Sequence, residues 1–224
     1  MNEKTLFDEW PEWYEQWFTT PIGKLVKETE SALVHELLGL KPGDELLDAG
    51  CGTGIFTLDF LTQGARVVGL DISRPMLDVA EKKLKGYPLY LVRGDMLYLP
   101  FKDNSFDKAV SVTALEFIED AAGAVSELFR VTRPGGCVVV ATLNSLSPWA
   151  ARRKARTYKH LLENAFFRSP DELLACGNVN GTAATCVHFE RDESPDEAVK
   201  IEKTCQLHKP ETGAFVAARW QKPG

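Results

Sequence analysis

A glycine-rich turn followed by an acidic residue is the part of the chain best suited to bind a ligand. Residues 46–54 read Leu-Leu-Asp-Ala-Gly-Cys-Gly-Thr-Gly. Alternate glycines let the backbone approach a ligand with no side chain in between. Asp71 ends the next apolar run, roughly 20 residues further on, where a carboxylate can accept hydrogen bonds from both hydroxyls of a ribose. The two features together predict a nucleoside site.

The spacing of these glycines differs from that of a dinucleotide site. A G-x-G-x-x-G fingerprint beginning at Gly50 needs glycine at position 55, where the chain has Ile55, and the third glycine comes one residue early, at Gly54. A dinucleotide needs the following helix N-terminus clear for its pyrophosphate, whereas a nucleoside with a short amino-acid tail carries no phosphate. The sequence favours the nucleoside, and a nucleotide-cofactor oxidoreductase stays as an alternative.

Alternating strands and helices are expected to position this turn. An N-terminal helical region comes first, in which Thr20 and Pro21 suit the start of a helix and Gly39 its end. Strands are then expected at 44–50, 65–71, 88–95, 106–112 and 137–143, with helices at 53–63, 73–85 and 119–133 between them. Residues 144–181 are expected to be mostly helical, and strands at 182–190 and 213–220 flank a helix at 194–207. Near-continuous apolar strands separated by helices indicate a parallel sheet covered on both faces.

Four segments carry a resemblance to a known family. They read LDAGCGTG (47–54), VVGLDIS (67–73), GDMLYLPFKDNSFD (94–107) and FRVTRPGG (129–136). These resemble successive motifs of class I S-adenosylmethionine-dependent methyltransferases, especially the small-molecule group that includes quinone-biosynthesis and malonyl-carrier methyltransferases. The resemblance covers about residues 40–145. It implies transfer of a methyl group from S-adenosylmethionine to a small-molecule acceptor by in-line displacement, with S-adenosylhomocysteine as the product.

The expected architecture follows from the pattern and the resemblance together. The fold class is α/β, a doubly wound Rossmann-like sheet of seven strands, mostly parallel with the last strand antiparallel, and with an N-terminal helical cap. We expect one domain over residues 1–224. It divides into the cap (1–40), the cofactor-binding core (41–143), a helical insertion near the substrate site (144–181) and C-terminal strands (182–224).

The resemblance also implies cofactor contacts, residue by residue. Asp71 would take the ribose hydroxyls, Asp95 would accept from the adenine amino group, and residues 111–116 would line the methyl-transfer centre. Tyr14 resembles a tyrosine that lies over the cofactor in relatives. The full set of expected cofactor-binding residues is Tyr14, Ala49, Gly50, Cys51, Gly52, Gly54, Asp71, Ile72, Met76, Asp95, Met96, Ser111 and Thr113.

Each of these residues also has a purely structural interpretation. Asp71 could cap a helix, although Ser73 already suits that role, and Asp95 could form a turn. Ile72, Met76 and Met96 could belong to the core. The stripe of Trp10, Trp13, Tyr14 and Trp17 is typical of a packed amphipathic helix. Cys51 is expected to be a small filler residue, because no basic neighbour lowers its pKa.

The sequence identifies no catalytic base. Holding a nucleophile and a methyl group in line supplies about 7–11 kcal/mol of a displacement barrier, so such enzymes need no shared catalytic residue. Glu116 stands where relatives often carry a histidine, and His160 and His188 could reach the site; these three are weak candidates. No asparagine-proline-proline-aromatic motif follows the fourth strand, which argues against methylation of nucleic-acid bases.

Composition narrows the class of protein further. The chain has 224 residues, a net charge of −6 and a pI of about 5.3, which makes duplex nucleic acid an unsuitable partner. No apolar run approaches the roughly 18 residues of a membrane span, and the first residues do not resemble a secretory signal. The five cysteines are widely spaced without a C-x-x-C pair, so neither a disulfide framework nor a metal site is expected. A cytoplasmic location fits best.

A basic segment suggests the chemistry of the acceptor. Between Asn144 and Arg168 lie six basic residues against one acid, and Arg152, Arg156 and Lys159 share one helical face with Trp149. In an acidic protein such a face attracts an anion, so the hypothesis is an acceptor that carries carboxylate or phosphate or is linked to an acidic carrier. A solvated helix surface is the alternative. A further alternative for the whole chain is a cofactor-binding but catalytically idle partner or regulatory protein.

Overall fold

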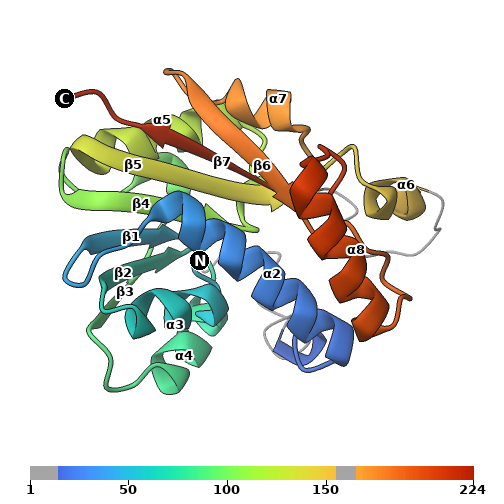
Figure 1. The fold of residues 1–224 in the computed structure, drawn as a ribbon. Coiled ribbons are helices and arrows are strands. Elements are labelled where there is room, and N and C mark those ends of the chain that lie inside the picture. Colours follow the sequence, from blue (N-terminus) through green and yellow to red (C-terminus); the bar gives the residue numbers. More distant parts are fainter. Residues whose placement is uncertain (1–14, 155–164) are drawn as a thin grey trace.

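The computed structural model of the chain describes residues 15–154 and 165–224. A seven-stranded sheet in the order β3-β2-β1-β4-β5-β7-β6 forms its centre (Figure 1). The strands are β1 (Glu45–Ala49), β2 (Arg66–Asp71), β3 (Leu89–Arg93), β4 (Phe106–Val112), β5 (Thr132–Leu143), β6 (Gly181–Cys186) and β7 (Phe215–Gln221). The pairs from β3 to β5 are parallel, whereas β7 is antiparallel to both β5 and β6. The predicted fold class, including the antiparallel last strand, is confirmed.

Helices cover both faces of this sheet (Figure 1). The α-helices are α2 (Pro21–Leu38), α3 (Ile55–Thr62), α4 (Arg74–Lys83), α5 (Ala121–Val131), α6 (Pro148–Lys154), α7 (Pro170–Leu174) and α8 (Pro195–His208), and η1 (Met96–Tyr98) and η2 (Leu115–Phe117) are 3₁₀ turns. Helices α2, α3 and α8 share one buried apolar cluster, and α5, α7 and η1 share the other. Because successive strand residues point to opposite faces, Leu46 enters the first cluster and Leu47 the second.

The ends of the helices follow the local sequence signals. The Thr20 side chain accepts a hydrogen bond from the Gly23 amide at the start of α2, and Gly39 ends that helix in the left-handed conformation. Ser73 caps α4 in the same way. Ser169 and Glu172 form a reciprocal capping box at α7. The N-terminal signals at Thr20 and Ser73 and the C-terminal signal at Gly39 are therefore confirmed.

Two predicted boundaries were wrong. The helix expected to reach residue 133 ends at Val131, and β5 begins at Thr132, ahead of the Pro-Gly-Gly turn that was expected to separate them. The reason is pairing with distant parts of the chain. Thr132 lies opposite Phe106 of β4, the Gly135 amide donates to the Lys222 carbonyl after β7, and the Lys222 amide donates to the Gly136 carbonyl. The insertion expected to be mostly helical contains, among its described residues, only the short helices α6 and α7.

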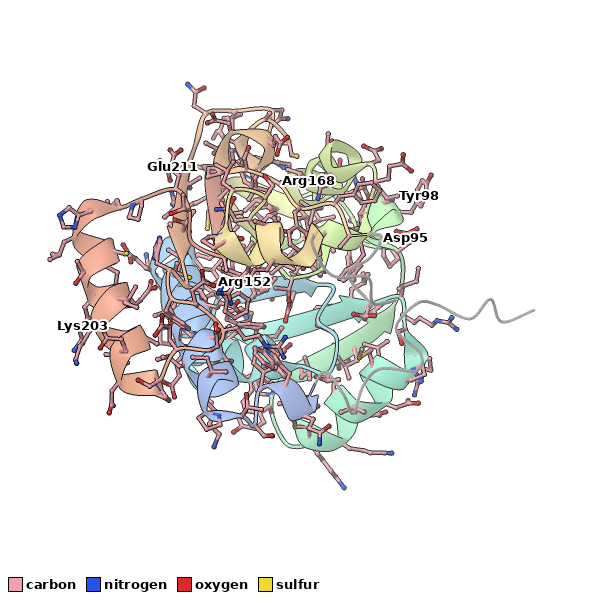
Figure 2. All side chains as sticks on the ribbon, turned by 90° about the vertical axis from the view of Figure 1, so that its right-hand side faces the viewer. Asp95, Tyr98, Arg152, Arg168, Lys203 and Glu211 are labelled. Carbon is pink, nitrogen blue, oxygen red and sulfur yellow. The ribbon has the colours of Figure 1, made fainter. Side chains whose placement is uncertain are left out.

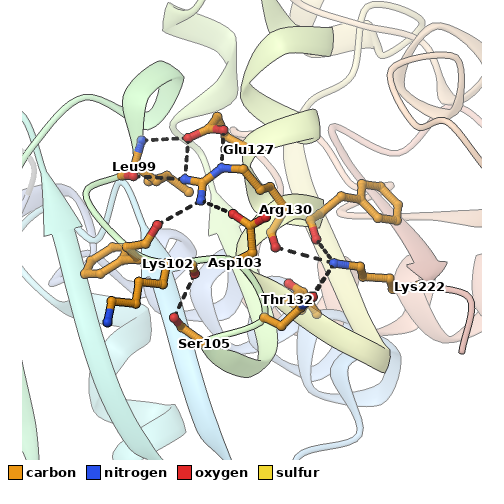
Figure 3. A network of polar contacts seen from close by, with 11 residues as sticks. Leu99, Lys102, Asp103, Ser105, Glu127, Arg130, Thr132 and Lys222 are labelled. Carbon is orange, nitrogen blue, oxygen red and sulfur yellow. Dashed lines mark hydrogen bonds and ion pairs between the residues drawn. The ribbon is translucent and has the colours of Figure 1, made fainter.

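A polar network holds the loop between η1 and β4 (Figure 3). Arg130 of α5 donates hydrogen bonds to Glu127, to Asp103 and to the Leu99 carbonyl, while Glu127 accepts from the Leu99 amide. Nearby, the Lys222 ammonium donates to the Thr132 carbonyl at 2.6 Å. This network lies at the amino-terminal end of β4 and holds the adjoining loop in place. It leaves the carboxyl ends of the strands, on the opposite side, available for a ligand.

No helix of the described residues is long and apolar enough to cross a membrane. Within that same part of the chain, no group of three or more His, Cys, Asp or Glu side chains is arranged to hold a metal ion.

Candidate functional site

A cavity of about 1250 Å³ opens at the carboxyl ends of the parallel strands. Its wall comes from the turns after β1, β2, β3 and β4, from α2, and from segments after β5 and β6. Figure 2 looks onto this edge, and the labelled Asp95 and Arg152 lie on the side that faces the reader. The chain reverses its strand order between β1 and β4, and ligands of doubly wound sheets bind at that switch point. The cavity is larger than the roughly 300–1,000 Å³ typical of a site for one small ligand, which leaves room for two.

The turn after β1 takes the conformation that its glycines allow. Gly50, Gly52 and Gly54 have φ values of +79°, +54° and +77°, in the left-handed region that favours glycine. A Cβ atom on Gly50 would lie 2.3 Å from the Cβ of Ala114, because the turns after β1 and β4 touch there. A Cβ on Gly52 would meet nothing within 4 Å, so this part of the turn lies open for a ligand to approach.

Asp71 ends β2 beside this turn and has both carboxylate oxygens directed by backbone donors. The Gly52 amide donates to Oδ2 at 2.8 Å and the Ser73 amide donates to Oδ1 at 2.8 Å. A carboxylate oxygen can accept more than one hydrogen bond, so this geometry is compatible with further donors such as two vicinal hydroxyls. The carboxylate lines the cavity and is otherwise buried. Because Ser73 itself caps α4, Asp71 is not needed for that role.

Three apolar side chains and one acid continue the cavity wall from Asp71. Met76 and Met96 are buried, whereas Ile72 is 45% exposed. Asp95 is half-buried and accepts from the Leu97 amide at 2.9 Å, so it caps η1 while it borders the cavity. All four residues expected at the adenine end therefore line one side of the cavity.

Some expected residues lie elsewhere. Ala49 and Ser111 are fully buried and Gly54 begins α3; none of the three is among the residues that line the cavity. Thr113 does line it, with a φ of +48° that is rare for a β-branched residue and typical of strained functional turns. Tyr14 lies outside the described residues.

Glu116 is buried directly below the cavity, on η2. Its Oε2 accepts from the Thr142 hydroxyl at 2.9 Å. Burial raises the pKa of Glu116 to about 7, although hydrogen bonds from its own backbone and Thr142 and the charge of Arg168 oppose the rise. Of the three candidate bases, Glu116 alone lines the cavity within the described part of the chain.

The histidine candidates are not at the cavity. His188 is buried against Glu202 at 3.2 Å, next to Thr185 and the Pro210 carbonyl, and it is not a cavity-lining residue. The structure does not bring His188 to the cavity, because its ring is held by the Glu202 carboxylate of α8 and lies against the Pro210 carbonyl. His160 lies outside the described residues.

A second buried carboxyl enters the cavity from α2. Glu30 is 5% exposed and lines the cavity opposite the sheet. Burial raises its pKa to about 8, and the negative charge of Glu116 adds to the rise. Helix α2 is held in place by Asp59 of α3, which accepts from Lys27 at 2.6 Å and from Ser31 at 2.8 Å. Lys27 and Ser31 flank Glu30, so their contacts fix the face that α2 presents.

A third buried carboxyl, Asp48, belongs to the glycine motif itself. It accepts from the Thr57 hydroxyl at 2.6 Å, and burial raises its pKa to about 7. Burial also raises the pKa of the Cys51 thiol well above its usual value, with added repulsion from Asp48 and Asp71. A thiol that stays protonated is no nucleophile, which agrees with the interpretation of Cys51 as a filler.

The described end of the N-terminal region lies across the cavity. Glu15 forms an ion pair at 2.6 Å with Lys83, the last residue of α4, and Phe18 packs edge-on against Phe56 of α3. The guanidinium of Arg191 lies 4.6 Å from the centre of the Trp17 ring. Trp17, the described member of the predicted aromatic stripe, thus lines the cavity, while Trp10, Trp13 and Tyr14 lie outside the described residues.

The basic face expected above the substrate site is described only in part. Arg152 of α6 lines the cavity and pairs with Asp192 at 2.8 Å and with Glu190 at 3.4 Å, so its charge is compensated. Arg156 and Lys159 lie outside the described residues. The other described arginine of the wall is Arg191, which is stacked on Trp17.

Sequence reasoning missed Glu30 as a site residue. A signal was present, since Val26, Glu30, Val34 and Leu38 recur every four residues and all four are buried. A charged residue at an apolar position of a helix is a candidate for function. Asp48 was quoted in the motif but given no role, although its place at the end of β1 puts it at the switch point.

The residues that line the cavity fit a nucleoside with a cationic tail. A phosphate-bearing ligand is unsuited to the end near Asp71, because the described lining there contains Asp48, Asp71 and Asp95 and no basic side chain. The open glycine turn and the doubly oriented Asp71 suit a ribose, and the surrounding carboxylates suit positive charge.

Comparisons with known proteins agree with this geometry. A family model described as a methyltransferase domain matches residues 47–140. A malonyl-[acyl-carrier protein] O-methyltransferase of Serratia marcescens is 33% identical over 185 residues, which cover 70% of this chain and 72% of that protein. A demethylmenaquinone methyltransferase of Beutenbergia cavernae is 43% identical over 115 residues, 51% of this chain and 47% of that protein. A crystal structure from Thermotoga maritima, described as a SAM-dependent methyltransferase and possible histamine N-methyltransferase, superposes with a TM-score of 0.76 at 26% identity, covering 97% of this chain and 98% of that one.

Proposed function

The chain belongs to the S-adenosylmethionine-dependent methyltransferase family, and from this we propose that it methylates a small molecule bound in the cavity at the carboxyl ends of β1 and β4. The observation that carries the proposal is the continuity of this cavity. It runs from Asp71 past the glycine turn to Glu116, so one cavity would hold the nucleoside and the acceptor side by side.

The cofactor contacts proposed here rest on the described geometry. Asp71 would hold the ribose hydroxyls with its two carboxylate oxygens, which the Gly52 and Ser73 amides orient beside the glycine turn. Ile72, Met76 and Met96 would flank the adenine, and Asp95 would accept from its amino group. The backbone of residues 50–52 would lie against the ribose and the amino-acid tail.

The reaction places modest demands on the protein. When bound, S-adenosylmethionine supplies a methyl group on a positively charged sulfur, which is already activated for in-line displacement. The chain would orient the acceptor against it with Thr113, Phe117 and Trp149, which line the part of the cavity beyond the glycine turn. The apolar rings would also exclude water. Alignment of this kind supplies about 7–11 kcal/mol of the barrier without a specialised base.

The relatives do not agree on an acceptor. Their names give malonyl-[acyl-carrier protein], demethylmenaquinone and histamine. The hypothesis of an anionic or carrier-linked acceptor came from the basic composition of residues 144–168, but Arg152, its described member at the cavity, is paired with Glu190 and Asp192. The names of the relatives therefore do not identify the acceptor of this chain. We keep a cytoplasmic location as a prediction.

The proposal is tested in two steps. Calorimetry with S-adenosylhomocysteine should show a single binding site that Asp71→Ala weakens and Glu28→Gln, an exposed change on α2, leaves unaltered. Incubation with methyl-labelled S-adenosylmethionine and a fractionated cell extract should then transfer label to a small molecule. Binding of S-adenosylhomocysteine without transfer to any fraction would favour the idle regulatory protein, and absence of binding would refute the proposal.

A further inference from the structure

We propose that Glu30 and Glu116 together form the recognition site for a protonatable nitrogen, and that the methyl acceptor is therefore a small organic amine. This inference rests on the proposed function, because it assigns the acceptor half of the same cavity. Its basis is the set of charged and aromatic side chains that the described residues place in that half, and the relatives' names play no part in it.

The two carboxyls come from separate parts of the chain and line the same cavity. Glu30 is carried by α2, which covers the sheet, and Glu116 by η2, directly after β4. Their side chains are 5% and 1% exposed, both line the cavity, and the charge of Glu116 acts on Glu30. Two elements distant in sequence thus direct acidic groups into the same hollow.

These carboxyls are not neutralised by the fold. In the part of the chain that the structure describes, Glu30 accepts no hydrogen bond and forms no ion pair. Glu116 accepts a hydrogen bond from the Thr142 hydroxyl. The guanidinium of neighbouring Arg168 donates instead to three backbone carbonyls, those of Leu115, Phe166 and Ile118. Arg168 therefore acts on Glu116 only through space.

A buried carboxyl that no basic side chain pairs with is costly to ionise, because a carboxylate there is less well solvated than in bulk water. Hydrogen bonds and Arg168 make Glu116 the first of the pair to ionise, and Glu30 must then ionise against that charge. A cation between them removes the repulsion and supplies the missing donors. The pair is accordingly a site with strong preference for a positive ligand.

Aromatic side chains complete this site. Trp17, Phe18, Phe117 and Trp149 line the same cavity, and the Trp149 indole is fixed by its hydrogen bond to the Phe189 carbonyl at 2.8 Å. Aromatic faces attract organic cations, most strongly when water is excluded. Over the whole described wall there are nine acidic residues and two arginines; Arg152 pairs with two of these acids, Glu190 and Asp192, and Arg191 is stacked on Trp17. An anionic nucleophile would meet repulsion at this depth.

The methylation of an amine balances without a further reactant. The ammonium first gives a proton to one of the two carboxylates, which burial makes more basic than an exposed carboxylate. The freed lone pair forms the N–C bond while the C–S bond of S-adenosylmethionine breaks and leaves its electron pair on sulfur. The product is a methylated ammonium and S-adenosylhomocysteine, and the carboxylic acid returns its proton to solvent.

The test uses three ligands of one shape and different charge. Phenethylamine, 2-phenylethanol and phenylacetate are titrated by calorimetry into the full chain saturated with S-adenosylhomocysteine. We expect phenethylamine to bind at least tenfold more tightly than either of the others. Repeating the titration at pH 7 in two buffers of different ionisation enthalpy should show proton release by the protein, because the cation drives the pair to ionise.

Variants then assign the effect to the pair. Glu30→Gln and Glu116→Gln should each weaken phenethylamine binding at least tenfold and reduce the proton release, while the matched exposed change Glu28→Gln alters neither. Retained affinity of each variant for S-adenosylhomocysteine shows that it is folded. If the wild-type chain binds S-adenosylhomocysteine but prefers phenylacetate, or does not distinguish phenethylamine from the alcohol, the inference is wrong and the proposed function stands. If S-adenosylhomocysteine itself does not bind, both fail.

Discussion

Replacing Glu30 by glutamine should change how the stability of the protein depends on pH. Burial raises the pKa of Glu30 from 4.5 to about 8. Between these two values the unfolded chain carries an ionised Glu30 while the native chain keeps it protonated, so the native state binds one more proton. Raising the pH through this window therefore destabilises the native state, by about 1.4 kcal/mol per pH unit and at most about 5 kcal/mol in all.

The measurement is urea unfolding followed by circular dichroism at pH 5, 6, 7 and 8. At pH 5 the wild type and Glu30→Gln should have nearly the same free energy of unfolding, because a protonated glutamate resembles glutamine. The variant should become the more stable of the two as the pH rises, by several kcal/mol at pH 8. Glu28→Gln, exposed on the same helix, should follow the wild type at each pH. A difference that stays constant from pH 5 to pH 8 would show that Glu30 does not titrate in this range, and the reasoning would be refuted.

Three further outcomes are expected. Asp71→Ala should reduce the affinity for S-adenosylhomocysteine by tenfold or more, about 1.5–3 kcal/mol for a charge-assisted hydrogen bond, with the circular dichroism spectrum unchanged; an unaltered dissociation constant by calorimetry would exclude the ribose role. Gly50→Ala should lower the free energy of unfolding by about 1–3 kcal/mol, because its φ of +79° is strained for alanine and the added Cβ meets the turn after β4; a melting temperature equal to the wild type would contradict this. If the acceptor proves anionic instead, replacing Arg152, Arg156 and Lys159 together by glutamine should raise its KM and flatten the salt dependence of kcat/KM. Steady-state kinetics would reveal both changes.

The cofactor half of the site was predictable from the sequence because its determinants are local. The turn after β1 has three residues in the left-handed conformation within five positions, and all three are glycines, so the sequence alone indicates the turn. Asp71 and Ser73 stand at a strand end and a helix start, where residue type and position agree. The order of strands could also be expected, since alternating strands and helices restrict a parallel sheet to few topologies.

The acceptor half was not predictable in this way because it depends on contacts between distant segments. Nothing near His188 in the sequence announces that Glu202 of α8 holds its imidazole, and so removes it from the site. The start of β5 differs from the predicted start for the same reason. Its first residues pair with Phe106, 26 positions earlier in the chain, and with the segment after β7. Local propensity gave way to tertiary pairing in each case.

Glu30 shows where a sequence signal and a tertiary contact combine. Its position between Val26 and Val34 marks it as a core residue of α2, and a carboxyl in a core needs a reason. Had α2 been rotated slightly, Glu30 would reach solvent and its burial would cost nothing; the hydrogen bonds from Lys27 and Ser31 to Asp59 hold α2 so that Glu30 points at the cavity instead. Those bonds also lower the pKa of Asp59 to about 2, against the effect of its burial, together with a contribution from His35. The fold thus contains a well-paired carboxylate on α3 whose contacts maintain an unpaired one on α2. Stability alone does not account for an unpaired buried acid held in this way, whereas the proposed cationic acceptor would supply the positive charge that Glu30 lacks.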